Sequence, residues 1–186
     1  MIITSAVIPL PVENVDTDQI IPARFLLGVT KVGFGDNLFA DQKADSAFVM
    51  NQPEMAGRQI LVAGHNFGCG SSREHAAWAV DQAGIKVIIS SLFSDIFKSN
   101  AFKNGLLPIT VSPAELAQLF AELAADPAAE LTVDIAAETL TFPSGYQHTF
   151  QLEPFRKKQL LAEQGDMEYL LSKEAEIAVY EIKMNK

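Results

Sequence analysis

Residues 64–77 read GHNFGCGSSREHAA, and the interpretation of the whole chain starts from this stretch. The apolar run QILVA precedes it at 59–63, and small and apolar residues, AAWAV, overlap its end at 76–80. A short apolar run predicts a buried strand, and an alanine-rich pattern after glycines predicts a helix. The stretch is therefore expected to join a strand to the N-terminus of a helix through a glycine-rich turn.

The polar residues at this junction predict an anion site, because a helix N-terminus presents unpaired N–H groups and a positive dipole end. Ser71 and Glu74 have the spacing of a capping box, which would merely start the helix. A cap does not explain the glycines around Cys69, the second hydroxyl at Ser72, or Arg73. A cation in the first helical turn opposes the dipole by about 0.3–1 kcal/mol. A carboxylate ligand, bound with about 1.5–3 kcal/mol, would outweigh that cost.

Three familiar types of site fit this stretch poorly. The glycine spacing differs from G-x-G-x-x-G, and no lysine follows as in a Walker loop. Ser71 lacks the G-x-S-x-G elbow of hydrolases, and His75 has no obvious acid to orient it. Cys69, His65 and His75 fall short of the ligand set of a structural zinc or iron–sulfur site. We interpret the two histidines as local hydrogen-bonding or capping groups and Cys69 as a packing residue.

The composition is that of an ordinary globular protein, with 48% apolar and 20% charged residues among 186. A chain of this length buries roughly 70% of its unfolded surface and needs neither disulfide nor metal to fold. No membrane-spanning run and no export leader are recognised. The net charge of −9 argues against a nucleic-acid partner. The single cysteine cannot form an internal disulfide, which fits a cytoplasmic protein.

The order of the elements predicts an α/β fold. Residues 59–109 read strand–helix–strand–helix–strand, which favours parallel strands with right-handed crossovers. Residues 1–10 predict a first strand that Pro9 and Pro11 stop. A helix is expected over 91–104, and Gly105 is expected to stop it. Four residues of this helix fall on one side: Phe93, Ile96, Phe97 and Ala101.

The second half of the chain predicts a separate antiparallel component. Serine, proline and glutamate at 112–115 form a helix start, and this helix is expected to end near 126–127. Short strands follow, with a tight turn before the last, and then helices. The strands are expected at 131–135, 139–142 and 146–152, and the helices at 154–164 and 166–182.

Three polar or irregular segments lie in the N-terminal part of the chain. Asp16, Thr17 and Asp18 would either cap a turn or orient a catalytic group. Residues 27–38 contain three glycines without periodicity and are interpreted as a loop, either a lid over a ligand or an ordinary connection. Residues 41–57 predict a short helix or irregular segment that ends at Pro53.

Residues 64–76 resemble the signature G-x-N-F-G-x-G-S-S-R-E-H-A of the swivelling domain of the aconitase superfamily. More narrowly, three further stretches resemble the family of small subunits of 3-isopropylmalate dehydratase (isopropylmalate isomerase). These are NVDTDQIIP at 14–22, FSDIF at 93–97 with NGLLP at 104–108, and LEPFRK at 152–157. The resemblance covers nearly the whole chain.

This resemblance implies a swivelling β/β/α domain in three layers, with a parallel sheet and a smaller antiparallel sheet. One domain would span 1–186, with a C-terminal helical extension from about 154. The implied activity is that of a hydro-lyase subunit in leucine biosynthesis, which isomerises 2-isopropylmalate and 3-isopropylmalate through 2-isopropylmaleate. The family's [4Fe–4S] cluster needs three cysteines, and this chain has one. The cluster is therefore expected on a partner large subunit, in a heterodimer or higher heteromer, and no metal is expected on this chain.

The resemblance also assigns roles by position. Ser71 matches the family's catalytic base, and Ser72 and Arg73 match groups that bind the substrate carboxylate. A serine hydroxyl is a poor base, so the N–H groups of the glycine turn, the helix terminus and Arg73 would stabilise its alkoxide. Asp16 and Asp18 would orient the site. The remaining supporting residues are expected to be Asn66, Gly68, Gly70, Glu74 and His75.

The loop at 29–37 departs from the citrate-using relatives, which place a carboxylate-binding arginine in this region. This chain has only Lys31 as a cation there, and Val32 and Phe34 make the loop apolar. An apolar wall suits an isopropyl group and would leave a citrate carboxylate unpaired. We therefore expect all three residues to contact substrate. Two alternatives stay open: a related hydro-lyase acting on citramalate/citraconate or homocitrate, and a non-catalytic anion-binding module.

Overall fold

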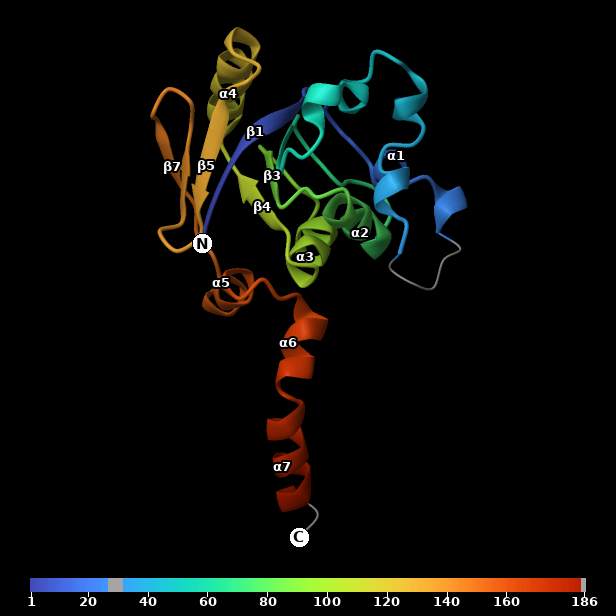
Figure 1. The fold of residues 1–186 in the computed structure, drawn as a ribbon, viewed down its shortest axis with the longest axis vertical. Helices are drawn as coiled ribbons and strands as arrows, with labels where there is room; N and C mark the ends of the chain where they lie inside the picture. The colour runs from blue at the N-terminus through green and yellow to red at the C-terminus, as the bar shows by residue number, and fades with distance from the viewer. Residues whose placement is uncertain (27–31, 185–186) are drawn as a thin grey trace.

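A seven-stranded mixed sheet runs through the molecule (Figure 1), in the order β4-β3-β2-β1-β5-β6-β7. The computed structural model describes residues 1–26 and 32–184. The strands are β1 Ile2–Leu10, β2 Ile60–Ala63, β3 Val87–Ser90, β4 Leu107–Thr110, β5 Glu130–Asp134, β6 Thr139–Thr141 and β7 Gln147–Thr149. Strands β1 to β4 pair in parallel, whereas β5, β6 and β7 pair antiparallel. The predicted α/β class, the parallel centre and the antiparallel meander are confirmed.

Strand β1 belongs to both parts of the sheet. Its residues 2–6 pair antiparallel with β5, and its residues 7–10 pair in parallel with β2. The prediction that Pro9 stops this strand is wrong, because Pro9 lies within it opposite Val62. The pairing with β5 has ended before Pro9, so its missing N–H falls on an edge without a partner strand, where proline is tolerated.

Helices cover the sheet on both sides. The α-helices are α1 Thr17–Ile20, α2 Glu74–Gln82, α3 Asp95–Lys103, α4 Pro113–Ala125, α5 Pro154–Leu161, α6 Asp166–Ser172 and α7 Glu174–Met184. Among the described residues, five short 3-10 turns lie between α1 and β2: η1 Ala23–Phe25, η2 Gly35–Asn37, η3 Gln42–Ala44, η4 Val49–Asn51 and η5 Pro53–Met55. Figure 1 shows α2 and α3 side by side on the parallel strands and α4 near β5.

The alternation of side chains along the buried strands produces two separate cores. Leu61 and Ala63 of β2 belong to the core that packs beneath α2 and α3. Ile60 and Val62 belong to the core that α4 and the antiparallel strands cover. Because successive strand residues point to opposite faces, the parallel strands separate these two cores.

Most helix signals are confirmed, with three corrections. Ser112 and Glu115 form the predicted capping box of α4. Helix α3 starts at Asp95, with Ser94 as its cap, instead of at residue 91. Ile96 does not share the buried face of that helix, since it is 49% exposed. The predicted final helix over 166–182 is broken at Lys173 into α6 and α7. Within the described residues, no helix has the length and apolarity to cross a membrane.

A hydrogen-bonded carboxylate ties the antiparallel hairpin to α4. The Glu115 carboxylate accepts from the Ser112 N–H at 2.7 Å, the Tyr146 hydroxyl at 2.9 Å and pairs with His148 Nδ1 at 2.8 Å. Its side chain is only 16% exposed. Burial raises the pKa of Glu115, but the hydrogen bonds from Ser112, His148 and Tyr146 outweigh it and lower the pKa to about 2.

This cluster predicts a loss of stability in acid. A carboxyl whose pKa falls from 4.5 unfolded to about 2 folded stabilises the protein fully above its unfolded pKa. We expect Glu115→Gln to lower the free energy of unfolding at neutral pH by up to about 3 kcal/mol. The difference from the unmodified chain should shrink as pH falls from about 4.5 toward 2, measured by urea denaturation. Glu130→Gln, at the exposed first residue of β5, is the matched control, and an equal pH dependence in both variants would refute the assignment.

Candidate functional site

Three loops that follow parallel strands meet at one edge of the sheet. They begin after Leu10 of β1, Ala63 of β2 and Ser90 of β3. The carboxyl ends of adjacent parallel strands are the usual position of ligand sites in α/β sheets. The stretch 64–73, which leads from β2 to α2, lies between the other two loops and carries the candidate site.

Backbone hydrogen bonds hold this middle loop against both neighbours. On one side, Gly68 N and Cys69 N donate to the Val15 carbonyl oxygen at 2.7 and 3.2 Å. Thr17 N donates in return to the Cys69 carbonyl at 3.0 Å. On the other side, Phe67 N donates to the Leu92 carbonyl at 2.9 Å. These bonds continue the pairing beyond the ends of the strands, and the predicted glycine-rich turn is a segment braced on both sides.

Gly68 allows the close approach of α3 to this loop. Its φ is +74°, a conformation that glycine adopts readily, and a Cβ there would overlap the ring of Phe97. The cap residue of α3, Ser94, donates from its hydroxyl to the Gly68 carbonyl at 2.5 Å. Gly70 also has a positive φ, +85°. Two of the glycines in the motif are thus required by backbone geometry.

The loop places Ser71 and Ser72 on the surface with their side chains exposed. The backbone at Ser71 is fixed from α1, because the Thr17 hydroxyl donates to the Ser71 carbonyl at 2.9 Å. The prediction that Ser71 caps the helix is wrong: α2 begins at Glu74, its N-cap position is Arg73, and no side chain caps it. Ser71 is held by a contact 54 residues away in sequence, which leaves its hydroxyl available.

Successive backbone N–H groups are available beside these serines. Within residues 1–26 and 32–184, none of the N–H groups of 70–75 has a hydrogen-bond acceptor. The expectation that the whole glycine turn supplies such groups needs correction, because Gly68 and Cys69 already donate to Val15. The free donors thus start at Gly70 and run into the first turn of α2, where the helix dipole adds positive potential.

Arg73 has an ionic partner within the chain. Its guanidinium pairs with the Asp18 carboxylate at the surface, with side chains 19% and 53% exposed respectively. The inference that an unexplained arginine lacks an anion when the chain stands alone is therefore wrong. Asp16 plays a different part, because its carboxylate caps α1 and accepts from Gln19 N at 2.7 Å. The structure thus brings Asp18 and Arg73 together and leaves Asp16 in the capping role.

The remaining supporting residues stabilise the surroundings of the loop. Asn66 has a positive φ of 64° and donates to the Asn14 side chain at 2.8 Å. The Glu74 carboxylate accepts from Trp78 Nε1 at 3.3 Å and from Asn104 Nδ2 at 3.2 Å. The first contact lies within α2, and the second joins α2 to the end of α3. The Glu74 carboxylate is therefore engaged by these groups and not by the serines.

The predicted hydrogen-bonding role is confirmed for His65 but not for His75, which has ring contacts instead. His65 Nδ1 lies 2.9 Å from the Ser91 hydroxyl. His75 packs on Trp78, with ring centroids 4.5 Å apart, and on Phe34 at 5.3 Å. Neither contact presents an imidazole to Ser71.

The predicted substrate wall is split by the structure. Lys31 lies outside the described residues. Val32 is 85% exposed, whereas Phe34 is 3% exposed and packs its ring against His75 and Trp78 in the core. Contact of these residues with substrate stays a prediction, and the exposed Val32 is better placed for it than Phe34.

The described residues contain no group of three or more histidine, cysteine, aspartate or glutamate side chains arranged to hold a metal ion. Cys69 is a free thiol of intermediate exposure whose carbonyl group supports the loop. The groups that the described residues place at the site are hydroxyls, N–H donors and one paired guanidinium.

Two residues that shape the site were not singled out from the sequence: the Val15 carbonyl receives two loop N–H groups, and Ser94 holds Gly68. Thr17 was expected only to cap a turn or orient a group, and its contact with Ser71 was not predicted. Val15 and Thr17 lie within the stretch at 14–22 and Ser94 within 93–97, which the family resemblance had already marked. Their contacts are too distant in sequence for local patterns to reveal.

Comparison with known proteins agrees with this geometry. The family model for the aconitase C-terminal domain matches residues 3–114, and the model LeuD_N matches 117–154. The 3-isopropylmalate dehydratase small subunit of Cytophaga hutchinsonii is 50% identical over 188 residues, covering 96% of this chain and 92% of the relative. This chain belongs to the 3-isopropylmalate dehydratase small-subunit family.

Two further relatives agree. The small subunit of Solibacter usitatus is 50% identical, covering 95% of this chain and 90% of the relative. The crystal structure of 3-isopropylmalate dehydratase (leuD) from Methanocaldococcus jannaschii superposes with a TM-score of 0.74 at 27% identity, covering 97% of this chain and 99% of the other. The α/β fold with its mixed sheet is thus shared within the small-subunit family.

The packing of Gly68 predicts a large stability cost for the smallest side chain. Gly68→Ala adds a left-handed alanine, costing about 1–2 kcal/mol, and an overlap with the buried Phe97 ring, costing about 1–3 kcal/mol more. Gly57→Ala is the matched control, since Gly57 has a similar φ of +77° and open space around it. Urea denaturation should show Gly68→Ala as the more destabilised variant; equal losses would mean that contact with α3 does not constrain the loop.

Proposed function

We propose that this chain is the small subunit of an isopropylmalate isomerase, the hydro-lyase that interconverts 2- and 3-isopropylmalate through 2-isopropylmaleate in leucine biosynthesis. The observation that carries the proposal is the exposed Ser71, whose backbone is fixed by Thr17 and which lies among residues 70–75 with unpaired N–H groups. Membership of the small-subunit family supports the choice of reaction and substrate.

In this proposal the chain acts as the swivelling domain of the aconitase type, with three layers and a single domain extended by helices from about residue 154. The two cores on opposite faces of the parallel strands support the layered arrangement. The complete enzyme consists of this chain and a large subunit, and it acts in the cytoplasm. The family name of the relatives, which are small subunits, supports such a partner.

Ser71 is the proposed base. It takes the proton from the carbon next to the one that carries the hydroxyl group, and it returns a proton during rehydration. An alkoxide at Ser71 needs donors that are already in place, because reorganising them would cost part of their stabilisation. The unpaired N–H groups at 70–75 and the start of α2 supply fixed positive potential. The Thr17–Ser71 bond keeps the backbone from moving away when charge develops.

Arg73 and Ser72 are the proposed carboxylate-binding groups. Arg73 is bound to Asp18 by one terminal nitrogen, Nη1. The guanidinium has five N–H donors, so a substrate carboxylate can bind those that Asp18 does not use. Asp18, which is more than half exposed, then orients the guanidinium at the cost of part of its positive charge.

Loss of the substrate hydroxyl needs a Lewis acid, and we place that group on the large subunit. The described residues offer no three-ligand cluster, and the chain has one cysteine. We assign a [4Fe–4S] cluster to the large subunit, where its iron would act as the Lewis acid for that hydroxyl. The residues of this chain bind and orient the carboxylate and move the proton.

Replacing the proposed base tests the function directly. In the complex with its large subunit, Ser71→Ala should lower kcat for isopropylmalate about 10²–10⁴-fold and leave KM close to its original value. Its stability should not change, because the hydroxyl is exposed. Ser46→Ala, at another exposed serine, is the control. Full turnover by Ser71→Ala, or turnover by the isolated chain, would overturn the proposal.

Substrate choice is tested at Val32, an exposed residue of the loop at 29–37. Val32→Arg should favour substrates that carry a carboxylate in place of the isopropyl group, through a charge-assisted bond of about 1.5–3 kcal/mol. This corresponds to a roughly 10–100-fold change in the ratio of kcat/KM values. Assays with isopropylmalate, citramalate and homocitrate would measure it. Phe34→Arg is a poor probe because it buries a charge in the core, and an unchanged ratio in Val32→Arg would remove this loop from recognition.

A further inference from the structure

The last two helices, α6 and α7, project from the body of the molecule (Figure 1). We call residues 166–184 the C-terminal arm. Every residue of α7 is exposed, and its large apolar side chains are 44–68% exposed. An isolated helix of fewer than about 12 residues is marginal in water, and α7 has 11. Its apolar surface therefore needs a partner that the rest of this chain does not provide.

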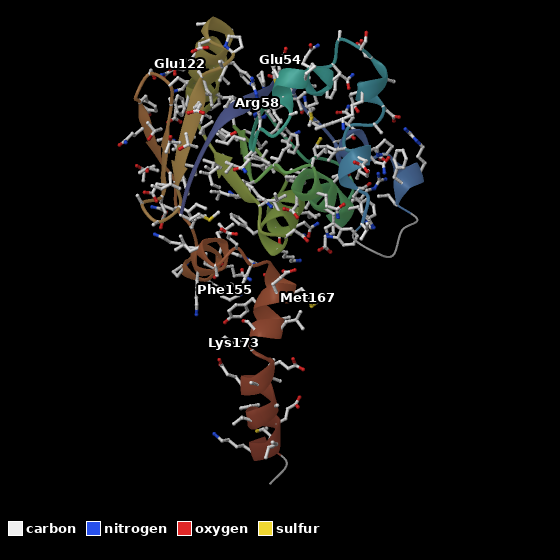
Figure 2. The ribbon with its side chains drawn as sticks, viewed as in Figure 1. Glu54, Arg58, Glu122, Phe155, Met167 and Lys173 are labelled. Atoms are coloured by element: carbon white, nitrogen blue, oxygen red, sulfur yellow. The ribbon has the colours of Figure 1, made fainter. Side chains whose placement is uncertain are left out.

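The root of the arm is firmly attached. Arg156 of α5 forms an ion pair with Asp166, whose carboxylate also accepts from Gln159 Nε2 at 2.9 Å. The Phe155 ring packs edge-on against Tyr169 at 5.0 Å. Figure 2 shows Phe155 and Met167 near this root and Lys173 further along the arm. The direction in which the arm leaves the body is thus set by specific contacts of α5 and α6.

Helix α7 presents two apolar stripes. At 100° per residue, Ala175, Val179 and Ile182 fall on one side, and Ile177, Tyr180 and Met184 on the opposite side. Charged rows separate these stripes. The rows consist of Glu174 with Glu181, and Glu176 with Lys183. A partner must therefore cover two opposite faces of the helix.

A second copy of this chain fits these features poorly. Two paired α7 helices would cover one stripe each and leave the other exposed. The arm carries five acidic and two basic side chains, so pairing two arms would also bring like net charges together. A two-walled apolar groove with basic residues along its rims would cover both stripes and match the charge.

The position of the root indicates which partner carries such a groove. Gly165, the residue just before the arm, packs against the carbonyl oxygen of Lys103, the last residue of α3. At the other end of α3, Ser94 holds Gly68 of residues 64–73, which we call the site loop. Nine helical residues span about 14 Å, and the 19-residue arm spans up to about 28 Å. A protein that covers the site loop is therefore within reach of the arm.

We propose that the C-terminal arm docks into an apolar, basic-rimmed groove on the large subunit. This inference rests on the proposed function for the existence of that partner. The arm supplies apolar contact area at a distance from Ser71, so its role is association and not chemistry. Its energetic contribution comes from burying the two stripes of α7.

The test measures the affinity of the full-length chain for the large subunit by isothermal titration. Val179→Gln/Ile182→Gln removes one stripe and Ile177→Gln/Tyr180→Gln the other, and glutamine keeps good helix propensity. Each pair should weaken Kd at least 100-fold. The control, Glu176→Gln/Lys183→Gln, changes two residues on a charged row without changing net charge, and its Kd should stay within a few-fold.

The outcomes separate this inference from the proposed function. Unchanged Kd in both stripe variants would overturn the docking. Light scattering on the isolated chains compares the stripe variants with the unmodified chain. A lower mass for the stripe variants, with Kd for the large subunit unchanged, would assign the arm to a second copy and would also overturn the docking. At saturating large subunit, stripe variants should recover full isomerase activity, whereas Ser71→Ala should bind normally and stay inactive. A complex that depends on the stripes but has no activity toward isopropylmalate would refute the function alone.

Discussion

The arrangement of the molecule depends on the two pairings of β1. Its first half aligns antiparallel with β5 and its second half parallel with β2, so one strand carries both parts of the sheet. The parallel half ends beside β2 and β3, which directs the three following loops to the same edge. The antiparallel half pairs with β5, so the antiparallel strands pack on the core that α4 also covers. The site loop is therefore supported by the adjacent ends of three parallel strands, β1, β2 and β3.

The site loop combines rigid backbone with free donors. Gly68 and Cys69 direct their N–H groups to Val15, and this anchoring fixes where the next residues lie. From Gly70 onward the N–H groups are unpaired, and α2 begins with no side-chain cap. Unpaired donors on a helix start are a small cost to stability when they face water. They become an advantage when an anion binds, because the donors are already oriented.

Local patterns predicted the elements well and their ends less well. The capping box at Ser112, the parallel centre and the antiparallel meander follow from short-range chemistry, and the structure contains them. Pro9, Ser71 and Arg73 were misread for one reason: each has its decisive neighbour far away in sequence. Pro9 depends on where β5 stops pairing, Ser71 on Thr17, and Arg73 on Asp18. The family signature identified the right segments, but it did not reveal which groups in them pair with each other.

The separation of the site from the arm has a physical rationale. A polar loop whose donors must remain available is a poor source of association energy, since burying it without a partner for each donor is costly. Apolar side chains carry no such penalty, and α7 concentrates them beyond α6, whose start lies about one length of α3 from the loop. Helix α3 connects the two, with Gly68 held at its start and Gly165 packed at its end. Since both ends of α3 are fixed by backbone contacts, a partner bound through α7 would be held at a defined distance from Ser71. Binding energy gained by the arm would then hold the two subunits together without requiring the donors of the loop to supply that energy.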